Sequence, residues 1–243
     1  MTERRFDRVL DLLGEKTHNR LMKARIAVIG LGGVGCHAAI ALARCGAGTL
    51  KLVDFDLLTE TSLNRNPVAG LSDVGKPKVE ILALQLRRTC PNTEIETLIE
   101  FFHEDTAAKI LDPPLDIVVD AIDSLNPKVA LLEYCVRNHI PVVSSMGASG
   151  RRDPSLVRRG DISQTSNCPL AKQLRKYLRK RGISEGIQCV YSVESAGKHA
   201  LPPDTDDQTL ERGRIRNRIP SLITIPGIFG YALADLVLEF VEE

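Results

Sequence analysis

The chain has 243 residues, of which 43% are hydrophobic and 26% are charged, and its formal net charge is +1. This length suffices for one large α/β domain, with or without a subdomain, and the composition is that of a globular protein. Because the overall charge is nearly neutral, an affinity for nucleic acid could arise only from local basic patches.

The chain shows no pattern of secretion or membrane insertion. The N-terminal stretch MTERRFDRVLDLLGEK has no apolar signal core. The most apolar run, residues 219–241, is interrupted by prolines, glycines and Asp235, so we expect no membrane span. Six cysteines are scattered without a C-x-x-C pair, which favours reduced thiols in a cytoplasmic protein and indicates no structural zinc site.

Strand-like and helix-like segments alternate through the first 150 residues. The predicted strands are 26–29, 49–53, 95–98, 117–120 and 141–144, and the predicted helices are 36–44, 76–89 and 128–138. This alternation is typical of a Rossmann-like, doubly wound, mostly parallel sheet with right-handed crossovers. Ligands bind beyond the carboxyl ends of such strands, so we expect one crevice there. The loops that would line it follow residues 29, 53, 119 and 144.

A C-terminal extension, residues 151–243, completes what we expect to be a single domain with a core at 1–150. Leucine and tyrosine side chains at 170, 174, 177 and 178 recur at helical spacing, so a helix there would bury one face and present a basic one. Residues 192–218 are polar and contain prolines, as expected of a crossover loop. A closing helix is predicted over 228–239.

The segment AVIGLGGVGCH, residues 27–37, predicts a strand, a glycine-rich turn and a helix that together bind a nucleotide. Gly30, Gly32 and Gly35 satisfy the dinucleotide pattern G-x-G-x-x-G, and Asp54 ends the next strand where a ribose-binding acid belongs. A hydride-transfer enzyme would also need an acid or base at a later strand end. No histidine stands there, and we interpret the histidines as structural or surface residues.

An ATP site explains more of the charged residues. Adenylation needs an acid for the ribose, cations for the phosphates and a carboxylate for magnesium. All three kinds occur on loops of the predicted crevice. They are Asp54, Asp56, Arg65, Lys76, Lys78, Asp120 and Asp123.

The motifs R-F-x-R, G-x-G-G-V-G, D-x-D, N-R, G-K-P-K and D-A-I-D resemble, in order and spacing, those of the ThiF/MoeB-type adenylating enzymes, relatives of the ubiquitin-activating enzymes. The resemblance covers residues 5–150. It implies that Gly33 and its neighbours approach the triphosphate of ATP and that Asp54 binds the ribose. It also implies that Arg65 and Lys78 contact phosphates and that Asp123 binds Mg²⁺. The implied nucleotide-binding set is Gly30, Gly32, Gly33, Gly35, Asp54, Asp56, Arg65 and Lys78.

The same resemblance implies a homodimer. An N-terminal arginine of these enzymes reaches the ATP of the partner subunit, and Arg8 in RFDR matches its position. Such an arginine would stabilise charge on the phosphoryl oxygens as pyrophosphate leaves.

Two absences separate this chain from activators of sulfur-carrier proteins. The paired C-x-x-C zinc motifs of those enzymes are missing, and the stretch RIRNRIPSL, residues 214–222, lacks their crossover-loop cysteine. A zinc-free activator of a ubiquitin-like carrier, with a sulfur-transfer or carrier protein as partner, therefore stays a second hypothesis. An NAD-dependent oxidoreductase is a third and a noncatalytic nucleotide-binding module a fourth.

A more extensive resemblance, over residues 4–195 and into the closing helix, is to the tRNA threonylcarbamoyladenosine dehydratases of this superfamily. It is carried by segments such as DSLNPKVALLEYCVRNHIPVV, DPSLVRRGDIS and PLAKQLRKYLRKRGI. It implies that ATP activates the carboxylate of a modified tRNA adenosine and that the substrate then cyclises with release of AMP. The basic helix, with Arg175, Lys176 and Arg179, then becomes the expected contact for tRNA phosphates.

Two positions within the shared ATP region differ from the family pattern. Where relatives have N-x-x-R-Q, this chain has Ser62 and Asn66 around Arg65, and Ser62 has the shorter reach. Cys189 could be a reactive thiol, but its apolar neighbours favour a buried strand cysteine.

Overall fold

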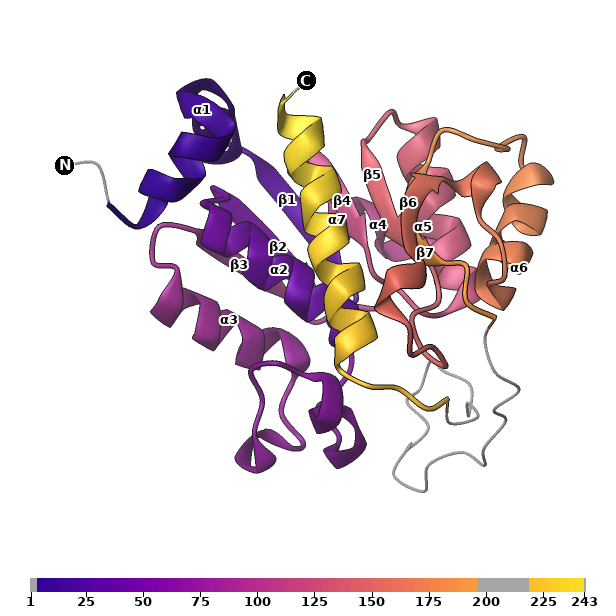
Figure 1. Ribbon diagram of the computed structural model, residues 1–243, viewed down its shortest axis with the longest axis horizontal. Coiled ribbons are helices and arrows are strands. Elements are labelled where there is room, and N and C mark those ends of the chain that lie inside the picture. The colour runs from indigo at the N-terminus through magenta and orange to yellow at the C-terminus, as the bar shows by residue number, and fades with distance from the viewer. Residues whose placement is uncertain (1–3, 196–218, 243) are drawn as a thin grey trace.

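The computed structural model describes residues 4–195 and 219–242, in which helices and strands alternate (Figure 1). The strands are β1 (Arg25–Ile29), β2 (Thr49–Val53), β3 (Glu94–Leu98), β4 (Ile117–Asp120), β5 (Val142–Ser145), β6 (Val157–Asp161) and β7 (Gln188–Ser192). The α-helices are α1 (Asp7–Leu21), α2 (Gly33–Cys45), α3 (Lys78–Thr89), α4 (Glu104–Leu111), α5 (Leu125–Arg137), α6 (Pro169–Arg179) and α7 (Thr224–Glu242).

The strands form one seven-stranded sheet in the order β3-β2-β1-β4-β5-β7-β6. Neighbouring strands are parallel except β6 and β7, which are antiparallel. The chain moves outward from β1 to β3 and then returns to place β4 on the other side of β1. Ligands of doubly wound sheets bind at such a switch point. The Rossmann-like, mostly parallel sheet predicted from the sequence is confirmed.

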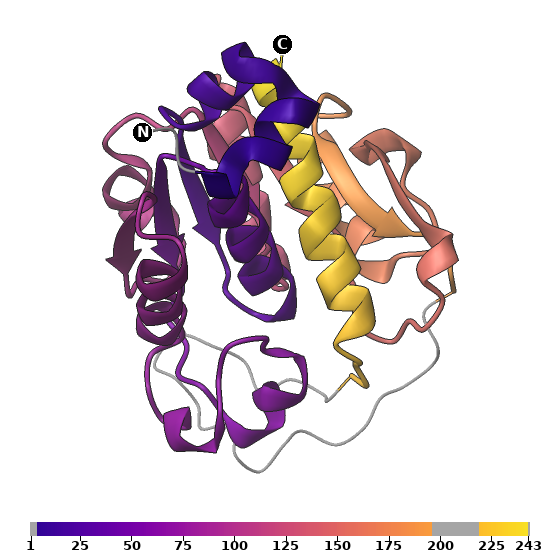
Figure 2. The same cartoon turned by 60° about the vertical axis from the view of Figure 1, so that its left-hand side comes forward.

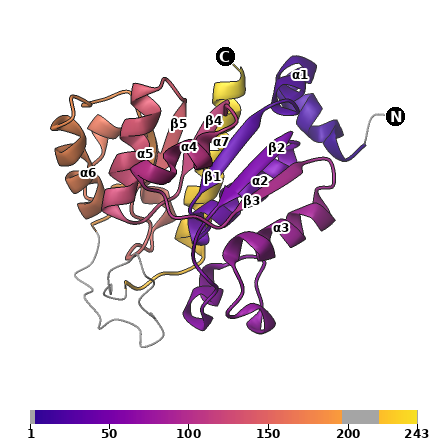
Figure 3. The same cartoon turned by 180° about the vertical axis from the view of Figure 1, so that it is seen from behind.

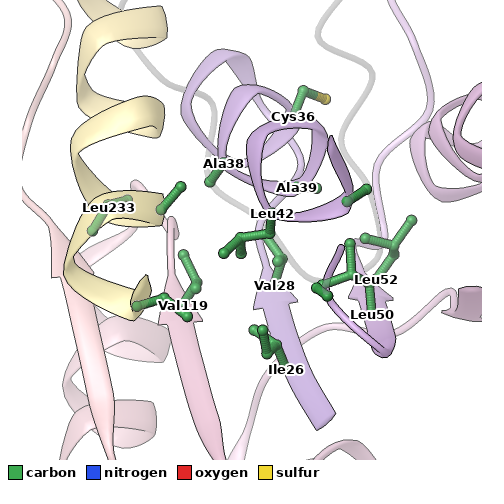
Figure 4. Close-up of a cluster of buried hydrophobic side chains, with 14 of the residues drawn as sticks. Ile26, Val28, Cys36, Ala38, Ala39, Leu42, Leu50, Leu52, Val119 and Leu233 are labelled. Atoms are coloured by element: carbon green, nitrogen blue, oxygen red, sulfur yellow. The ribbon is translucent and has the colours of Figure 1, made fainter. Parts of the chain in front are cut away.

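Both faces of the sheet are covered by helices, because successive side chains of each strand point to opposite faces. Ile26 and Val28 of β1 belong to one cluster with residues of α2 and α7. Figure 4 shows α2 on this side of β1, with Leu42 next to Val28. Ala27 and Ile29 face the opposite cluster, which includes residues of α4 and α5. Figure 3 shows α4, α5 and α6 covering that side of the sheet.

The closing helix α7 packs closely on α2. A Cβ atom at Gly230 would lie 2.5 Å from the carbonyl oxygen of Val34, so only glycine allows this approach of the two backbones. By length and composition α7 could cross a membrane, but 56% of its most apolar stretch is buried against the rest of the molecule. This burial is that of a core helix.

Three elements, α1, α4 and β6, were missing from the sequence prediction, and β7 was indicated only by the interpretation of Cys189 as a strand cysteine. Helix α1 contains Gly14 at φ 76°, where the helix is kinked, and α4 has only eight residues. Strand β6 has the sequence VRRGD, whose charged residues conceal its pattern. The helices α2 and α7 begin at Gly33 and Thr224, earlier than expected, and α3 begins at Lys78 rather than at residue 76. Most of the expected crossover loop, residues 196–218, lies outside the described residues.

Candidate nucleotide site

The glycine-rich turn between β1 and α2 packs directly on the loop that follows β4. Gly30 has φ +90°, and a Cβ atom there would lie 2.8 Å from the carbonyl oxygen of Ala121. A Cβ atom at Gly35 would lie 1.8 Å from the carbonyl oxygen of Gly30, so side chains are excluded at both positions. At Gly32 a Cβ atom would meet nothing within 4 Å, which leaves the top of the turn open.

The open turn leads into the first turn of α2. An α-helix leaves the N–H groups of its first turn without partners inside the helix, and its dipole favours anions there. The N-cap is Gly32, which has no side chain to occupy those groups. A Cβ atom at Gly33 would lie 3.0 Å from Pro226 of α7 and 3.3 Å from Arg65. The backbone donors of α2 therefore face a hollow that Arg65 lines, and Pro226 of α7 packs beside Gly33.

Asp54 follows β2 beside this turn. Its Oδ2 accepts a hydrogen bond from the Leu31 N–H at 2.5 Å, and its Oδ1 accepts one from the Asp56 N–H at 2.8 Å. The residue is 7% exposed. Burial raises the pKa of the Asp54 carboxyl, although the nearby Lys78 ammonium opposes the shift. The two hydrogen bonds fix a partly desolvated carboxyl group at the carboxyl end of the sheet.

Lys78 begins α3 on the other side of Asp54. Its Nζ lies 2.5 Å from Oδ2 of Asp56, and its side chain is 13% exposed. Burial disfavours the ammonium, but the carboxylates of Asp54 and Asp56 outweigh burial and raise the pKa of Lys78. Beneath the turn, burial and then Asp54 raise the pKa of the Cys36 thiol to about 12, so this thiol stays protonated.

Next to these groups lies one small open hollow at the N-terminus of α2, which we call the α2 hollow. Arg65 is half-buried at its wall, where its Nη1 donates to the carbonyl oxygen of Thr61 at 2.8 Å and to Oδ1 of Asn64 at 3.0 Å. The hollow is lined by Leu31, Gly32, Gly33, Ser62, Arg65, Asn66 and Lys78.

The two residues that differ from the family pattern have local partners. Ser62 Oγ donates to the carbonyl oxygen of Thr59 at 2.7 Å and accepts from the Thr59 N–H at 3.2 Å. Asn66 Oδ1 accepts from the N–H groups of Val68 and Ala69, both at 3.0 Å. Both side chains line the hollow while they also hold the backbone of the loop.

Asp123 lies in the loop between β4 and α5. Its side chain is exposed, Ser124 Oγ donates to its Oδ1 at 3.3 Å, and its charge helps to raise the pKa of Lys78. Within residues 4–195 and 219–242, no group of three His, Cys, Asp or Glu side chains could hold a metal ion. Mg²⁺ commonly binds through one or two carboxylates together with substrate phosphates and water, so a single carboxylate suits Mg²⁺ carried by ATP.

Arg8 and the basic helix lie away from this cavity. Figure 2 shows α1, which carries Arg8, at the top of the molecule and the segment after β2 at the bottom. On α6, Lys176 and Arg179 are exposed, whereas the guanidinium of Arg175 donates to the carbonyl oxygen of Thr165 at 2.7 Å and to its hydroxyl. Cys189 is fully buried in β7, as its apolar neighbours predicted, and burial raises the pKa of its thiol.

The sequence interpretation missed a buried arginine at the carboxyl ends of β5 and β7. Arg151 is 5% exposed, and its guanidinium donates to the carbonyl oxygens of Gly147, Asn167 and Glu194. It therefore ties together three loops. The doublet Arg151-Arg152 is visible in the sequence as part of a basic stretch, but no pattern there indicates which of the two is buried.

Comparisons with known proteins show the family of the chain. The family model described as "ThiF family" matches residues 6–243. The chain is 36% identical to tRNA threonylcarbamoyladenosine dehydratase 2 of Saccharomyces cerevisiae over 96% of its own length, but it spans only 55% of that protein. It is 41% identical to tRNA threonylcarbamoyladenosine dehydratase of Bacillus subtilis, over 75% of this chain and 72% of that one. A crystal structure of the E. coli dehydratase in complex with ATP superposes with a TM-score of 0.86 at 32% identity, covering 98% of this chain and 93% of that one.

Proposed function

The chain belongs to the ThiF family, and from this premise we propose that it is an ATP-dependent dehydratase of threonylcarbamoyladenosine in tRNA. The observation that carries the proposal is the α2 hollow, where open helix N–H groups, Arg65 and Lys78 meet beside the buried acid Asp54. The similarity to dehydratases extends over 96% of the chain and therefore well past the nucleotide site. We regard residues 1–243 as one adenylating domain in the cytoplasm, in agreement with its six free thiols.

The hollow supports a role for each nucleotide-binding residue. The backbone of Gly30, Gly32, Gly33 and Gly35 forms a turn that admits phosphates to the N-terminus of α2. Asp54 can accept hydrogen bonds from ribose hydroxyls, and Asp56 holds Lys78 in place. Arg65 and Lys78 provide the positive charge that the phosphates need, and these charge-assisted contacts are stronger than neutral ones.

Asp123 is the residue that would hold Mg²⁺. When bound, Mg²⁺ would supply positive charge to neutralise the phosphate oxygens. The exposed carboxylate of Asp123 is close enough to the Lys78 ammonium for its charge to help raise the pKa of that lysine.

The reaction that we propose has two steps, and neither requires a nucleophile from the protein. The carboxylate of threonylcarbamoyladenosine attacks the α-phosphate of ATP, a P–O bond forms, and pyrophosphate leaves. The carbamoyl oxygen then attacks the acyl carbon of the resulting acyl-adenylate, which closes a ring and releases AMP. The raised pKa of the buried thiols of Cys36 and Cys189 is consistent with this chemistry, because neither sulfur would be a thiolate.

We propose further that Arg8 completes the site of a partner subunit in a homodimer. It lies in the first turn of α1, next to Phe6, which packs against Gly46 at the C-terminal end of α2, whereas the hollow lies at the N-terminus of that helix. An arginine so placed cannot serve the hollow of its own chain, so a shared site requires a second copy.

The assignment is tested by measuring pyrophosphate release with three acceptors: tRNA carrying threonylcarbamoyladenosine, the same tRNA without the modification, and a ubiquitin-like carrier protein. We expect release with the modified tRNA only, together with one AMP for each cyclised adenosine. Turnover with the carrier alone would overturn the tRNA assignment in favour of a carrier-protein activator. Binding of NAD without affinity for ATP would overturn both.

A further inference from the structure

An ion pair is completely buried beneath the loop that carries Asp123. Lys128 Nζ lies 2.7 Å from Oδ2 of Asp120, and both side chains have 0% exposure. Asp120 ends β4, and Lys128 lies in the first turns of α5. The hydroxyl of Ser144, on the neighbouring strand β5, donates to the same Oδ2 at 2.7 Å. The pair therefore joins two strands and one helix below the candidate nucleotide site.

The pair holds the backbone of Ile122 on both sides. The Ile122 N–H donates to Oδ1 of Asp120 at 3.1 Å, and the Ile122 carbonyl oxygen accepts from Lys128 Nζ at 2.9 Å. Ile122 is the residue directly before Asp123. The direction in which the chain enters Asp123 is thus fixed by the two buried side chains.

The same loop supports the glycine-rich turn. The position of a Cβ atom on Gly30 would be 2.8 Å from the carbonyl oxygen of Ala121, and one on Gly35 would be 3.3 Å from Cβ of Ala121. Ala121 lies between the residue that forms the ion pair and the residue that the pair holds. A shift of this loop would therefore move both Asp123 and the floor of the phosphate site.

The ion pair is a poor way to stabilise a core. Removing two charges from water is expensive, and apolar side chains of similar volume often replace a buried pair without loss of stability. Lys128 also occupies a position of α5 among buried apolar residues such as Val129 and Leu132, where a hydrocarbon side chain would pack. Its charge requires another explanation, and the hydrogen bonds to Ile122 provide one.

We propose that Asp120 and Lys128 are positioning residues that orient Asp123 toward the Mg²⁺ of bound Mg-ATP. The inference rests on the proposed nucleotide site but is independent of which acceptor the enzyme uses. Groups that orient a metal ligand from behind typically change metal affinity by about 10- to 100-fold when they are removed.

The test uses an apolar replacement of the whole pair, Asp120→Val with Lys128→Met. Binding of a fluorescent ATP analogue is titrated with Mg²⁺ and, by electron paramagnetic resonance, with Mn²⁺. We expect the metal concentration at half-saturation to rise by about tenfold or more. We expect the variant to stay folded with a lower melting temperature, because Ile122 and Ser144 lose hydrogen-bond partners. The affinity for the analogue in EDTA should fall by a smaller factor than the affinity for the metal ion.

A matched control is Lys51→Met. Lys51 is a second buried lysine, 7% exposed, but its Nζ donates to the carbonyl oxygens of Lys109 and Asp112, away from the Asp123 loop. This variant should be less stable yet keep the metal midpoint of the wild type. Should the control shift that midpoint equally, or should the folded double variant keep it, the positioning role is wrong.

Ser144→Ala decides the question if the double variant does not fold. It removes one hydrogen bond to Asp120 and retains the ion pair, so we expect a smaller rise in the metal midpoint, about threefold, with the fold intact. An unchanged midpoint in this variant would overturn the proposal. A wild type that binds no nucleotide at all would overturn the ATP site itself, and the inference with it.

Discussion

Asp54 illustrates how the environment of a single residue gives the protein a pH dependence. In the unfolded chain its pKa has the ordinary value of 3.8, and burial raises it in the folded protein. Between these two values the folded state binds more protons than the unfolded state. Its contribution therefore favours folding below pH 3.8 and decreases as pH rises to the raised pKa.

Because the contribution of Asp54 to stability decreases with rising pH, we expect the variant Asp54→Asn to have a different pH profile. The free energy of unfolding of the wild type, measured in urea across this pH range, should contain a decrease with rising pH that the variant lacks. Saturating ATP should reduce the decrease in the wild type, because a ligand that prefers the carboxylate favours the charged form. Parallel pH profiles of the two proteins would show that Asp54 titrates normally.

The sequence does not distinguish Lys76 from Lys78, but the structure predicts that only Lys78 contributes strongly to ATP binding. Lys78 is 13% exposed beside Asp54 and Asp56, whereas Lys76 is 53% exposed and pairs with Asp73. We expect Lys78→Met to weaken ATP binding by about 10- to 100-fold, in keeping with loss of a charge-assisted hydrogen bond. Lys76→Met is the matched control and should bind ATP like the wild type in calorimetric titration. Equal losses in both variants would mean that only the overall charge matters.

The sequence could identify these acids and cations because their order along the chain carries the information. The sequence could not identify the groups with which these side chains form hydrogen bonds and ion pairs. The guanidinium of Arg175 hydrogen-bonds to Thr165 and that of Arg151 ties three loops, although both residues stand in equally basic stretches. Lys128 gave one signal, a charge among the apolar positions of a predicted helix, but its geometry depends on Asp120 and Ser144 from other elements.

Helix α6 separates a packed face from a charged one. Ala171, Leu174 and Leu178 are buried, while Lys172, Lys176 and Arg179 are exposed at a spacing that places them on one side of the helix. A row of cations of this kind suits the phosphate backbone of tRNA.

We therefore expect the combined variant Lys172→Gln, Lys176→Gln and Arg179→Gln to bind modified tRNA more weakly. The slope of log affinity against log salt should decrease by about 0.7 to 0.9 for each lost phosphate contact. Lys16→Gln with Lys23→Gln, on and just beyond α1, removes exposed charges elsewhere and serves as the control in filter-binding assays. An unaffected slope in the α6 variant would make this face ordinary solvated surface.

Helices and strands were predicted correctly where burial gives the sequence a clear apolar pattern, and they were missed where it does not. The central strands β1, β2 and β4 are buried on both faces and appear as apolar runs. Strand β6 forms the antiparallel edge of the sheet with exposed Arg158 and Arg159, so its sequence carries no such run. Its position depends on pairing with β7, which is a tertiary property.

At the level of the whole molecule, a shared active site predicts complementation between two inactive variants. Arg8→Ala removes the arginine that a chain contributes to the site of its partner. Lys78→Met removes the lysine that a chain contributes to its own α2 hollow. In a mixed dimer one of the two sites has both residues intact. Random exchange of subunits should therefore restore about one quarter of the wild-type rate of pyrophosphate release.

Each variant alone provides the control for this experiment and should be nearly inactive with modified tRNA. If Arg8 acted within its own chain, or not at all, mixing would restore nothing beyond the average of the two variants.

The crevice itself could be predicted from the alternation of strands and helices, because the switch point follows from topology. The position of Arg8 relative to a second copy of the chain could not be predicted from residue patterns, because they contain no distance between two molecules.

Helix α7 has a consequence for how the protein is made. Its first turn places Pro226 against Gly33, and Gly230 allows it to pack closely on α2, so the start of α2 gains this packing only after the last helix of the described fold has been translated. A ribosome-bound chain that ends before α7 would have the glycine-rich turn but not the packing of Pro226 and Gly230 on α2. We therefore expect the candidate nucleotide site to reach its final form only after α7 has been synthesised and has packed on α2.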